Sequence, residues 1–167
     1  MSEKGTPQDP VKMLAKMIKG MRIAMLSSVE ADGTIHARPM ATQDLEFNGT
    51  LWFFTQASSH KVEEVDRDPH VNVAFSDEGN ARYVSMSGTA ELVRDAAKIR
   101  EYWSPILKAW FKGGPEDPDL ALLKVSVQHA QYWDAPSSRM VRLAGIVRAA
   151  VTGEQYQGNS GTVNLPH

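Results

Sequence analysis

The chain has 167 residues, of which 42% are hydrophobic and 23% are charged, a composition typical of one globular domain. Its 18 basic and 20 acidic residues leave a formal net charge of −2, which argues against a general binder of nucleic acids or anionic membranes. It has no cysteine, which excludes disulfides, thiolate catalysis, cysteine-bound zinc and iron–sulfur clusters. No segment has the ~20 apolar residues of a membrane span, and no secretory signal begins the chain. We therefore expect a soluble cytoplasmic protein.

Apolar periodicity and turn residues predict helices that alternate with strands. In chain order we expect helix 9–20, strands 22–29, 34–40 and 50–55, helix 61–67, strands 70–75 and 81–93, helix 95–111, strand 122–133 and helix 139–151. Asp32-Gly33 and Asn48-Gly49 are hairpin signals, so the first three strands are expected to form a meander. Pro39 cannot donate to a β ladder and belongs at an edge or bulge, and Ser87-Gly88 indicates a bulge in the long strand.

Capping residues and hairpin connections indicate the fold class. Asp9 caps the first helix ahead of Pro10, and Ser58 or Ser59 caps the helix after the third strand. Hairpins join most of the strands, which disfavours a parallel α/β sheet. We expect a mainly β fold with peripheral helices, a six-stranded antiparallel β-barrel. It would form a single domain over 1–167, with flexible ends at 1–8 and 154–167.

Several classes of chemistry have no signal in the sequence. The five histidines stand apart and none has the paired spacing of a metal centre, so no metal site is predicted; they are His36, His60, His70, His129 and His167. There is no Gly-x-Ser-x-Gly elbow, no dinucleotide-binding glycine motif and no phosphate loop. Hydrolase chemistry and nucleotide-triphosphate folds are therefore disfavoured.

The segment from Thr55 to Lys61 suggests an anion site. It follows an apolar strand and opens a helix, where unpaired N–H groups and the helix dipole favour negative charge. Ser59 can donate a hydroxyl, Lys61 and His60 can add positive charge, and Arg38 on a neighbouring strand could reach the same corner. An ordinary capped helix with solvated charges explains the same residues, and on this motif alone that simpler interpretation is favoured over an anion site.

Aromatic residues give a second, weaker indication. The consecutive residues Trp52-Phe53-Phe54 cannot all face one core from a simple strand, so a dimer interface or a flat aromatic ligand would explain them. Trp103, Trp110 and Phe111 have helical spacing and are expected to be packing residues. Trp133 fits either a core position or the edge of a pocket.

The order of several motifs resembles a known family. Segments 27–33, 37–40 and 51–61 resemble the pyridoxamine 5′-phosphate oxidase-like flavin-binding split barrels, and segments 103–118 and 130–136 resemble their general stress protein 26 branch. The resemblance runs from about residue 10 to residue 153. It implies that each chain folds as a six-stranded antiparallel split barrel. Two chains would form a homodimer that binds two flavin mononucleotides (FMN) at the subunit interface. Flavin adenine dinucleotide (FAD) would require an open end to the pocket.

The resemblance also implies which residues contact the flavin. Arg38, Pro39 and Met40 would lie along the isoalloxazine edge, with Arg38 near the phosphate as well. Phe54 and Thr55 match an aromatic–threonine pair that contacts the flavin. The family's phosphate-binding turn is matched by Ser59, His60 and Lys61. Tyr83 matches a glutamine near the flavin, and Trp133 matches a tryptophan that the partner subunit contributes.

The chain departs from the oxidase itself at three places. It has Gln43 and His60 where the oxidase has a lysine and an arginine, and Ser138–Arg142 lacks its Arg-x-His substrate motif. A phosphorylated vitamin B6 substrate would lose charged contacts, so we do not expect pyridoxamine phosphate oxidase activity. The expected function is an FMN-dependent oxidoreductase of the general stress response with unknown substrate. A non-catalytic flavin-binding module, or a relative that uses deazaflavin or haem, remains as an alternative.

Overall fold

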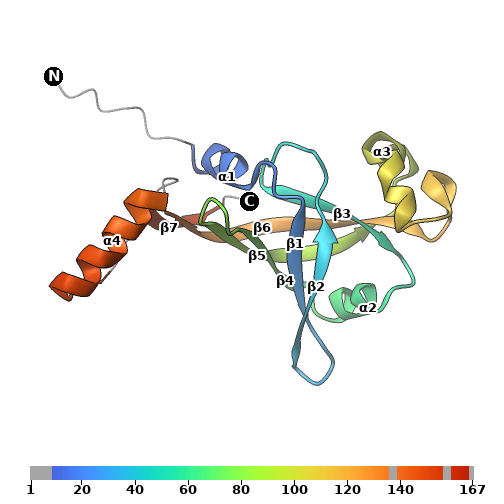
Figure 1. The fold of residues 1–167 in the computed structure, drawn as a ribbon. Coiled ribbons are helices and arrows are strands. Elements are labelled where there is room, and N and C mark those ends of the chain that lie inside the picture. Colours follow the sequence, from blue (N-terminus) through green and yellow to red (C-terminus); the bar gives the residue numbers. More distant parts are fainter. Residues whose placement is uncertain (1–8, 136–138, 156–158, 166–167) are drawn as a thin grey trace.

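The computed structural model describes residues 9–135, 139–155 and 159–165, and one curled antiparallel sheet forms its centre (Figure 1). The helices are α1 (Pro10–Ile18), α2 (His60–Arg67), α3 (Ala96–Tyr102) and α4 (Arg139–Thr152), with 3₁₀ helices η1 (Pro105–Ala109) and η2 (Gly114–Glu116). The strands are β1 (Ile23–Val29), β2 (Ile35–Ala41), β3 (Thr50–Gln56), β4 (His70–Asp77), β5 (Arg82–Val93), β6 (Leu120–Asp134) and β7 (Asn159–Asn164). The predicted mainly β split barrel with peripheral helices is confirmed. Residues 1–8, which we expected to be flexible, lie outside the described residues.

The strands follow the order β2-β1-β4-β5-β6-β3, and β7 pairs with β6 beside β3. The hairpin at Asp32-Gly33 is confirmed, with Gly33 at a φ of +85° that favours glycine. The predicted meander is wrong at its third strand, because β3 pairs with β6 instead of β2. Both β3 and the first part of β6 are buried on both faces, because one face packs on the core inside the sheet and the other on apolar residues of α3 and η1. β2 remains an edge strand, which confirms the expected place of Pro39.

The C-terminal tail contains a strand that the sequence did not indicate. β7 lies within the segment 154–167 that we expected to be flexible, and it pairs with the second half of β6. Its residues are mostly small and polar, and only Val163 and the following Leu165 are buried in the core. With so little apolar alternation, the pairing depends on the exposed edge of β6 and not on the tail's own strand propensity.

The predicted helix 95–111 is also corrected, because it is interrupted at its centre. α3 ends at Tyr102, and a separate 3₁₀ turn begins at Pro105. Ser104, which precedes the proline, has an extended backbone (φ −126°, ψ 140°). A proline disfavours helical geometry in the residue before it, which is why the helix stops here.

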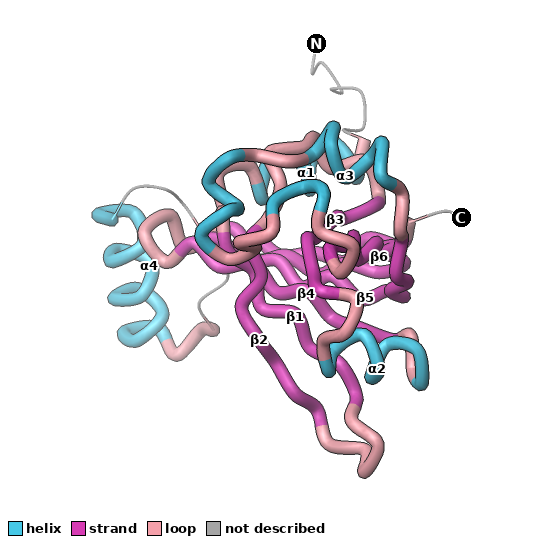
Figure 2. Tube along the Cα trace, turned by 90° about the vertical axis from the view of Figure 1, so that its right-hand side faces the viewer, coloured by secondary structure: helices cyan, strands magenta, loops and turns pink. Residues whose placement is uncertain are grey.

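The consecutive aromatic residues of β3 face two different cores. Phe53 lies in the main core inside the sheet, which α1 covers at one end (Figure 2). Phe54 faces outward into a second cluster, where its ring is 5.8 Å from that of Trp103 and 6.2 Å from that of Phe111. The second core accounts for apolar residues on both faces of this strand. Packing roles are confirmed for Trp103 and Phe111, but Trp110 is 62% exposed and was predicted wrongly.

The remaining helices lie around the sheet. α2 lies on the opposite side of the molecule from α1 (Figures 1 and 2). α4 follows β6 directly and projects beyond the end of the sheet (Figure 1). None of the helices in the described residues is long and apolar enough to cross a membrane.

Candidate anion-binding site

The turn between β3 and α2 is fixed by one acidic residue from another part of the chain. Asp119 precedes β6, and its carboxylate accepts hydrogen bonds from the Ser58 N–H (3.0 Å) and the Ser58 hydroxyl (2.7 Å). Its carbonyl accepts a third from the Ala57 N–H at 2.8 Å. These hydrogen bonds hold the turn in place ahead of α2. The first N–H groups of a helix have no partner within the helix, so they are available to a ligand at this turn.

Three side chains around this turn form a polar cluster, which we call the cradle: Thr55, Ser59 and Lys61. Lys61 Nζ donates to Thr55 Oγ1 at 3.0 Å and to Ser59 Oγ at 3.3 Å, and the two hydroxyls are 3.3 Å apart. Ser59 occupies the predicted N-cap position, but its hydroxyl makes no capping hydrogen bond. Two hydroxyls and an ammonium group at the start of a helix are suited to the oxygens of an anion.

The charge of Lys61 is poorly compensated inside the protein. Among the described residues, no carboxylate lies within 4.0 Å of its Nζ. Burial lowers the pKa of Lys61, and the nearby positive charge of Arg38 lowers it further, while Glu64 opposes these two effects. A half-buried ammonium group whose protonated form is disfavoured would be stabilised by a bound anion. This fits the phosphate group of a nucleotide.

Arg38 is held beside the cradle by a buried acid. Its Nη1 donates to Ser28 Oγ at 2.5 Å, and its Nη2 lies 2.9 Å from Glu64 Oε2 and 3.1 Å from His36 Nδ1. Arg38 is 16% exposed and Glu64 is fully buried. Burial alone would raise the pKa of Glu64, but hydrogen bonds from Ser28 and Arg38, together with the charges of Arg38 and His60, hold it below its ordinary value. Glu64 is thus an internal counter-ion for Arg38.

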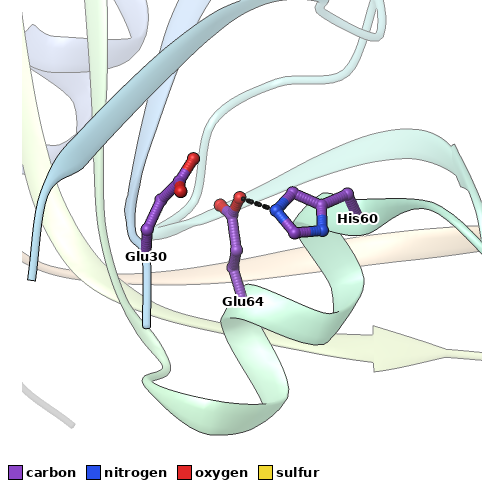
Figure 3. Close-up of side chains that lie close together, drawn as sticks. All are labelled: Glu30, His60 and Glu64. Atoms are coloured by element: carbon purple, nitrogen blue, oxygen red, sulfur yellow. Dashed lines mark ion pairs between the residues drawn. The ribbon is translucent and has the colours of Figure 1, made fainter. Parts of the chain in front are cut away.

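His60 faces this acid as well. Its Nε2 is 3.2 Å from Glu64 Oε1, and its Nδ1 is 3.5 Å from Glu63 Oε2. Glu30, at the end of β1, completes a group in which the possible ligand atoms of Glu30, His60 and Glu64 lie within 4.8 Å of one another (Figure 3). Sequence reasoning missed Glu64 and Glu30. The available signal was helical spacing, because Glu64 follows His60 by four residues and therefore shares its face.

The other residues implied by the resemblance are more dispersed. Met40 is buried in the main core, whereas Pro39 is exposed on the outer face opposite Met25. The ring of Phe54 is buried in the second core, so its side chain is not available at the cradle. The structure therefore brings together Arg38 with the cradle and His60, but not Pro39, Met40 or the ring of Phe54.

Tyr83 and Trp133 are cross-strand partners at the far end of β6. They are 40% and 45% exposed. Thr55 of the cradle pairs with Ala121 near the beginning of the same strand. At roughly 3.3 Å per residue, Ala121 and Trp133 are separated by about 40 Å along β6. One small ligand cannot contact the cradle and these two aromatic residues within one chain.

Comparisons with known proteins agree with this architecture. General stress protein 26 of Bacillus subtilis is 27% identical over 141 residues, which are 81% of this chain and 96% of that protein. The solved structure of a provisional general stress protein 26 from Jannaschia sp. has a TM-score of 0.72 and 28% identity, covering 90% of this chain and 95% of that one. The general stress FMN/FAD binding protein of Xanthomonas citri has a TM-score of 0.65 and 34% identity, covering 77% and 90%. A protein family described as pyridoxamine 5′-phosphate oxidase like matches residues 9–157. This match spans most of the sequence, and the chain therefore belongs to the pyridoxamine 5′-phosphate oxidase-like family.

Proposed function

We propose that this protein binds FMN and that the cradle holds its phosphate. The observation that carries the proposal is Lys61, a half-buried ammonium group bonded to Thr55 and Ser59 with no carboxylate within 4.0 Å in the described residues. The Xanthomonas citri relative, which is named as an FMN/FAD binding protein, supports a flavin as the ligand. Because Glu64 already balances Arg38, we assign most of the phosphate's charge compensation to Lys61 and the α2 N-terminus.

We further propose that the binding site is completed by a second copy of the chain. Tyr83 and Trp133 present exposed aromatic rings about 40 Å along β6 from the cradle. In a homodimer, these rings from one subunit would contact the flavin whose phosphate is held by the other. Flat aromatic side chains of this kind can cover an apolar ring system.

The bound flavin would supply the redox chemistry of an oxidoreductase in the general stress response. The chain would orient the flavin and shield it from water. Gln43 and His60 stand where a pyridoxamine phosphate oxidase has two more basic residues, and the amide Nε2 of Gln43 is buried without a hydrogen-bond partner among the described residues. We therefore propose a substrate other than a phosphorylated vitamin B6 compound.

Titration of the apo-protein with FMN tests the phosphate site. Lys61→Ala removes a charged contact worth about 1.5–3 kcal/mol, which corresponds to a loss of affinity of roughly 10- to 150-fold. Lys108→Ala is the matched control, because Lys108 is an exposed lysine on η1. Equal FMN affinity in the two variants would remove the assignment of the cradle.

Reduction kinetics test the oxidoreductase proposal separately. We expect a nicotinamide nucleotide to reduce the bound flavin rapidly and an added acceptor to reoxidise it over many turnovers. Tight FMN binding without reduction by either nicotinamide nucleotide would instead favour a flavin-binding module that does not turn over.

A further inference from the structure

The group of Glu30, His60 and Glu64 has the composition and spacing of a metal centre. Two ligands of a tetrahedral zinc ion, each about 2.0–2.2 Å from the metal, lie about 3.3 Å apart. His60 Nε2 and Glu64 Oε1 are 3.2 Å apart, and the ligand atoms of all three residues lie within 4.8 Å of one another. The carboxylate of Glu64 lies between the side chains of Glu30 and His60 (Figure 3). Two of these residues come from α2, and Glu30 comes from the hairpin after β1.

The two oxygens of Glu64 have different surroundings. Oε2 accepts hydrogen bonds from Ser28 and Arg38. Oε1 is buried and accepts no hydrogen bond from the described residues, although His60 Nε2 is close to it. The imidazole is therefore not aligned to donate a proton to Oε1. A buried carboxylate oxygen that has no hydrogen bond and lies 3.2 Å from an imidazole nitrogen is available to bind an ion together with that imidazole.

We propose that Glu30, His60 and Glu64 bind a divalent transition-metal ion of the zinc type, with Glu64 Oε1 as the buried ligand. Imidazole and carboxylate groups are the nitrogen and oxygen ligands that such ions accept. The hydrogen bonds from Ser28 and Arg38 to Oε2 would fix the carboxylate, as outer-shell contacts do in metal sites. Glu30 and Glu64 would supply two negative charges to the ion, while Arg38 is paired with the other oxygen of Glu64.

The site is open to an incoming ion. His60 is 66% exposed and the Glu30 side chain 33% exposed, so both can rotate toward an ion from solvent while Glu64 stays fixed. Three protein ligands leave at least one coordination position for water or an anion. The inference rests on this group alone and does not depend on flavin binding.

Calorimetric titration of the full chain with Zn²⁺ tests the proposal. We expect one ion per chain in the wild type, and a loss of affinity of more than about tenfold in Glu30→Gln, since even outer-shell changes cost about that much. Glu63→Gln is the matched control, because Glu63 contacts the other ring nitrogen of His60 but is not in the group. An absence of zinc binding in the wild type, or equal affinity in the wild type and Glu30→Gln, would overturn the proposal.

A second set of variants separates this site from other histidines. His60→Asn should abolish the same single binding event, whereas His70→Asn, which alters the exposed Asp68–His70 pair, should leave it unchanged. Loss in His70→Asn but not in His60→Asn would place the ion elsewhere and refute the assignment. Glu30 is outside the cradle, so Glu30→Gln should still bind FMN. Failure of the metal proposal and failure of the flavin proposal are therefore distinguishable in one protein.

Discussion

Glu64 is an ionised residue in the interior whose main partner is Arg38. A buried carboxylate is costly unless hydrogen bonds and an opposite charge compensate it. Here Ser28 and Arg38 supply both, and the pKa of Glu64 is held below its ordinary value of 4.5 despite its burial. The same contacts fix the side chain of Arg38 beside the cradle.

Replacing this acid tests the ion pair through the free energy of unfolding. Glu64→Gln should reduce that free energy at neutral pH by about 3 kcal/mol, because it leaves the Arg38 guanidinium without a partner. The pKa of Glu64 is lower in the folded than in the unfolded protein, so its contribution is present above pH 4.5 and is lost as the pH falls through the folded-state pKa. The difference between wild type and variant should therefore shrink in acid.

Urea unfolding between neutral and acidic pH measures this difference. Glu63→Gln is the control, since Glu63 is an exposed neighbour on the same helix. A difference between wild type and Glu64→Gln that stays constant through the acidic range would show that the charge of Glu64 is not what stabilises the fold.

Residues of the site that are close in sequence could be predicted, and those that depend on long-range contacts could not. Thr55, Ser59 and Lys61 share one strand-to-helix turn, so local capping and dipole arguments indicated them. Glu64 looked like an ordinary charged residue of a short helix. Its burial depends on the packing of α2 against β1, 36 residues away at Ser28, and no local pattern encodes that contact.

The longest ladder of the sheet contains one position that only glycine can occupy. The register of β5 and β6 shifts between Ser87 and Gly88, which confirms the predicted bulge. A Cβ atom at Gly88 would lie 2.0 Å from the backbone oxygen of Ser126. Because the obstacle is backbone, small side-chain rotations cannot relieve the clash.

Overpacking typically costs about 1–3 kcal/mol, and because the obstacle here is backbone, Gly88→Ala should destabilise the protein by an amount near the upper end of that range. For a chain of this length, each 1 kcal/mol lowers the melting temperature by about 2–4 °C. Gly79→Ala is the control, since a Cβ there would be 3.6 Å from its nearest neighbour and the position is exposed. Equal melting temperatures for the two variants in calorimetry would contradict the steric argument.

At the level of elements, local signals predicted β1 to β6 but missed β7, and they assigned β3 to the wrong neighbour. The β1–β2 hairpin was predictable because Asp32-Gly33 fixes it within a few residues. The pairing of β3 was not predictable, because the turn residues Asn48-Gly49 indicate that the chain reverses direction but not which strand β3 pairs with. The three adjacent aromatic residues reflect the burial of β3 on both faces, but they do not indicate which strand pairs with it.

The whole molecule exposes an apolar surface where the proposed dimer would need one. α4 carries the exposed side chains of Leu143, Ile146, Val147 and Val151, and it projects past the end of β6 that bears Trp133 (Figure 1). A helix of 14 residues is marginal in water without tertiary packing. Because α4 follows the strand that bears Trp133, we propose that a second copy of the chain covers this apolar face and also completes the flavin site.

Val147→Glu should separate the subunits, because it places a charge at the centre of this apolar face. Light scattering should give twice the 18.4 kDa chain mass for the wild type and the single mass for the variant. Ile35→Glu is the control, since Ile35 is an equally apolar exposed residue at the β1–β2 hairpin.

The monomeric variant should also bind FMN more weakly although its cradle is intact, because the partner's aromatic rings are absent. A Val147→Glu protein that stays dimeric would exclude α4 from the interface, and a monomer with unchanged FMN affinity would refute a site shared between subunits.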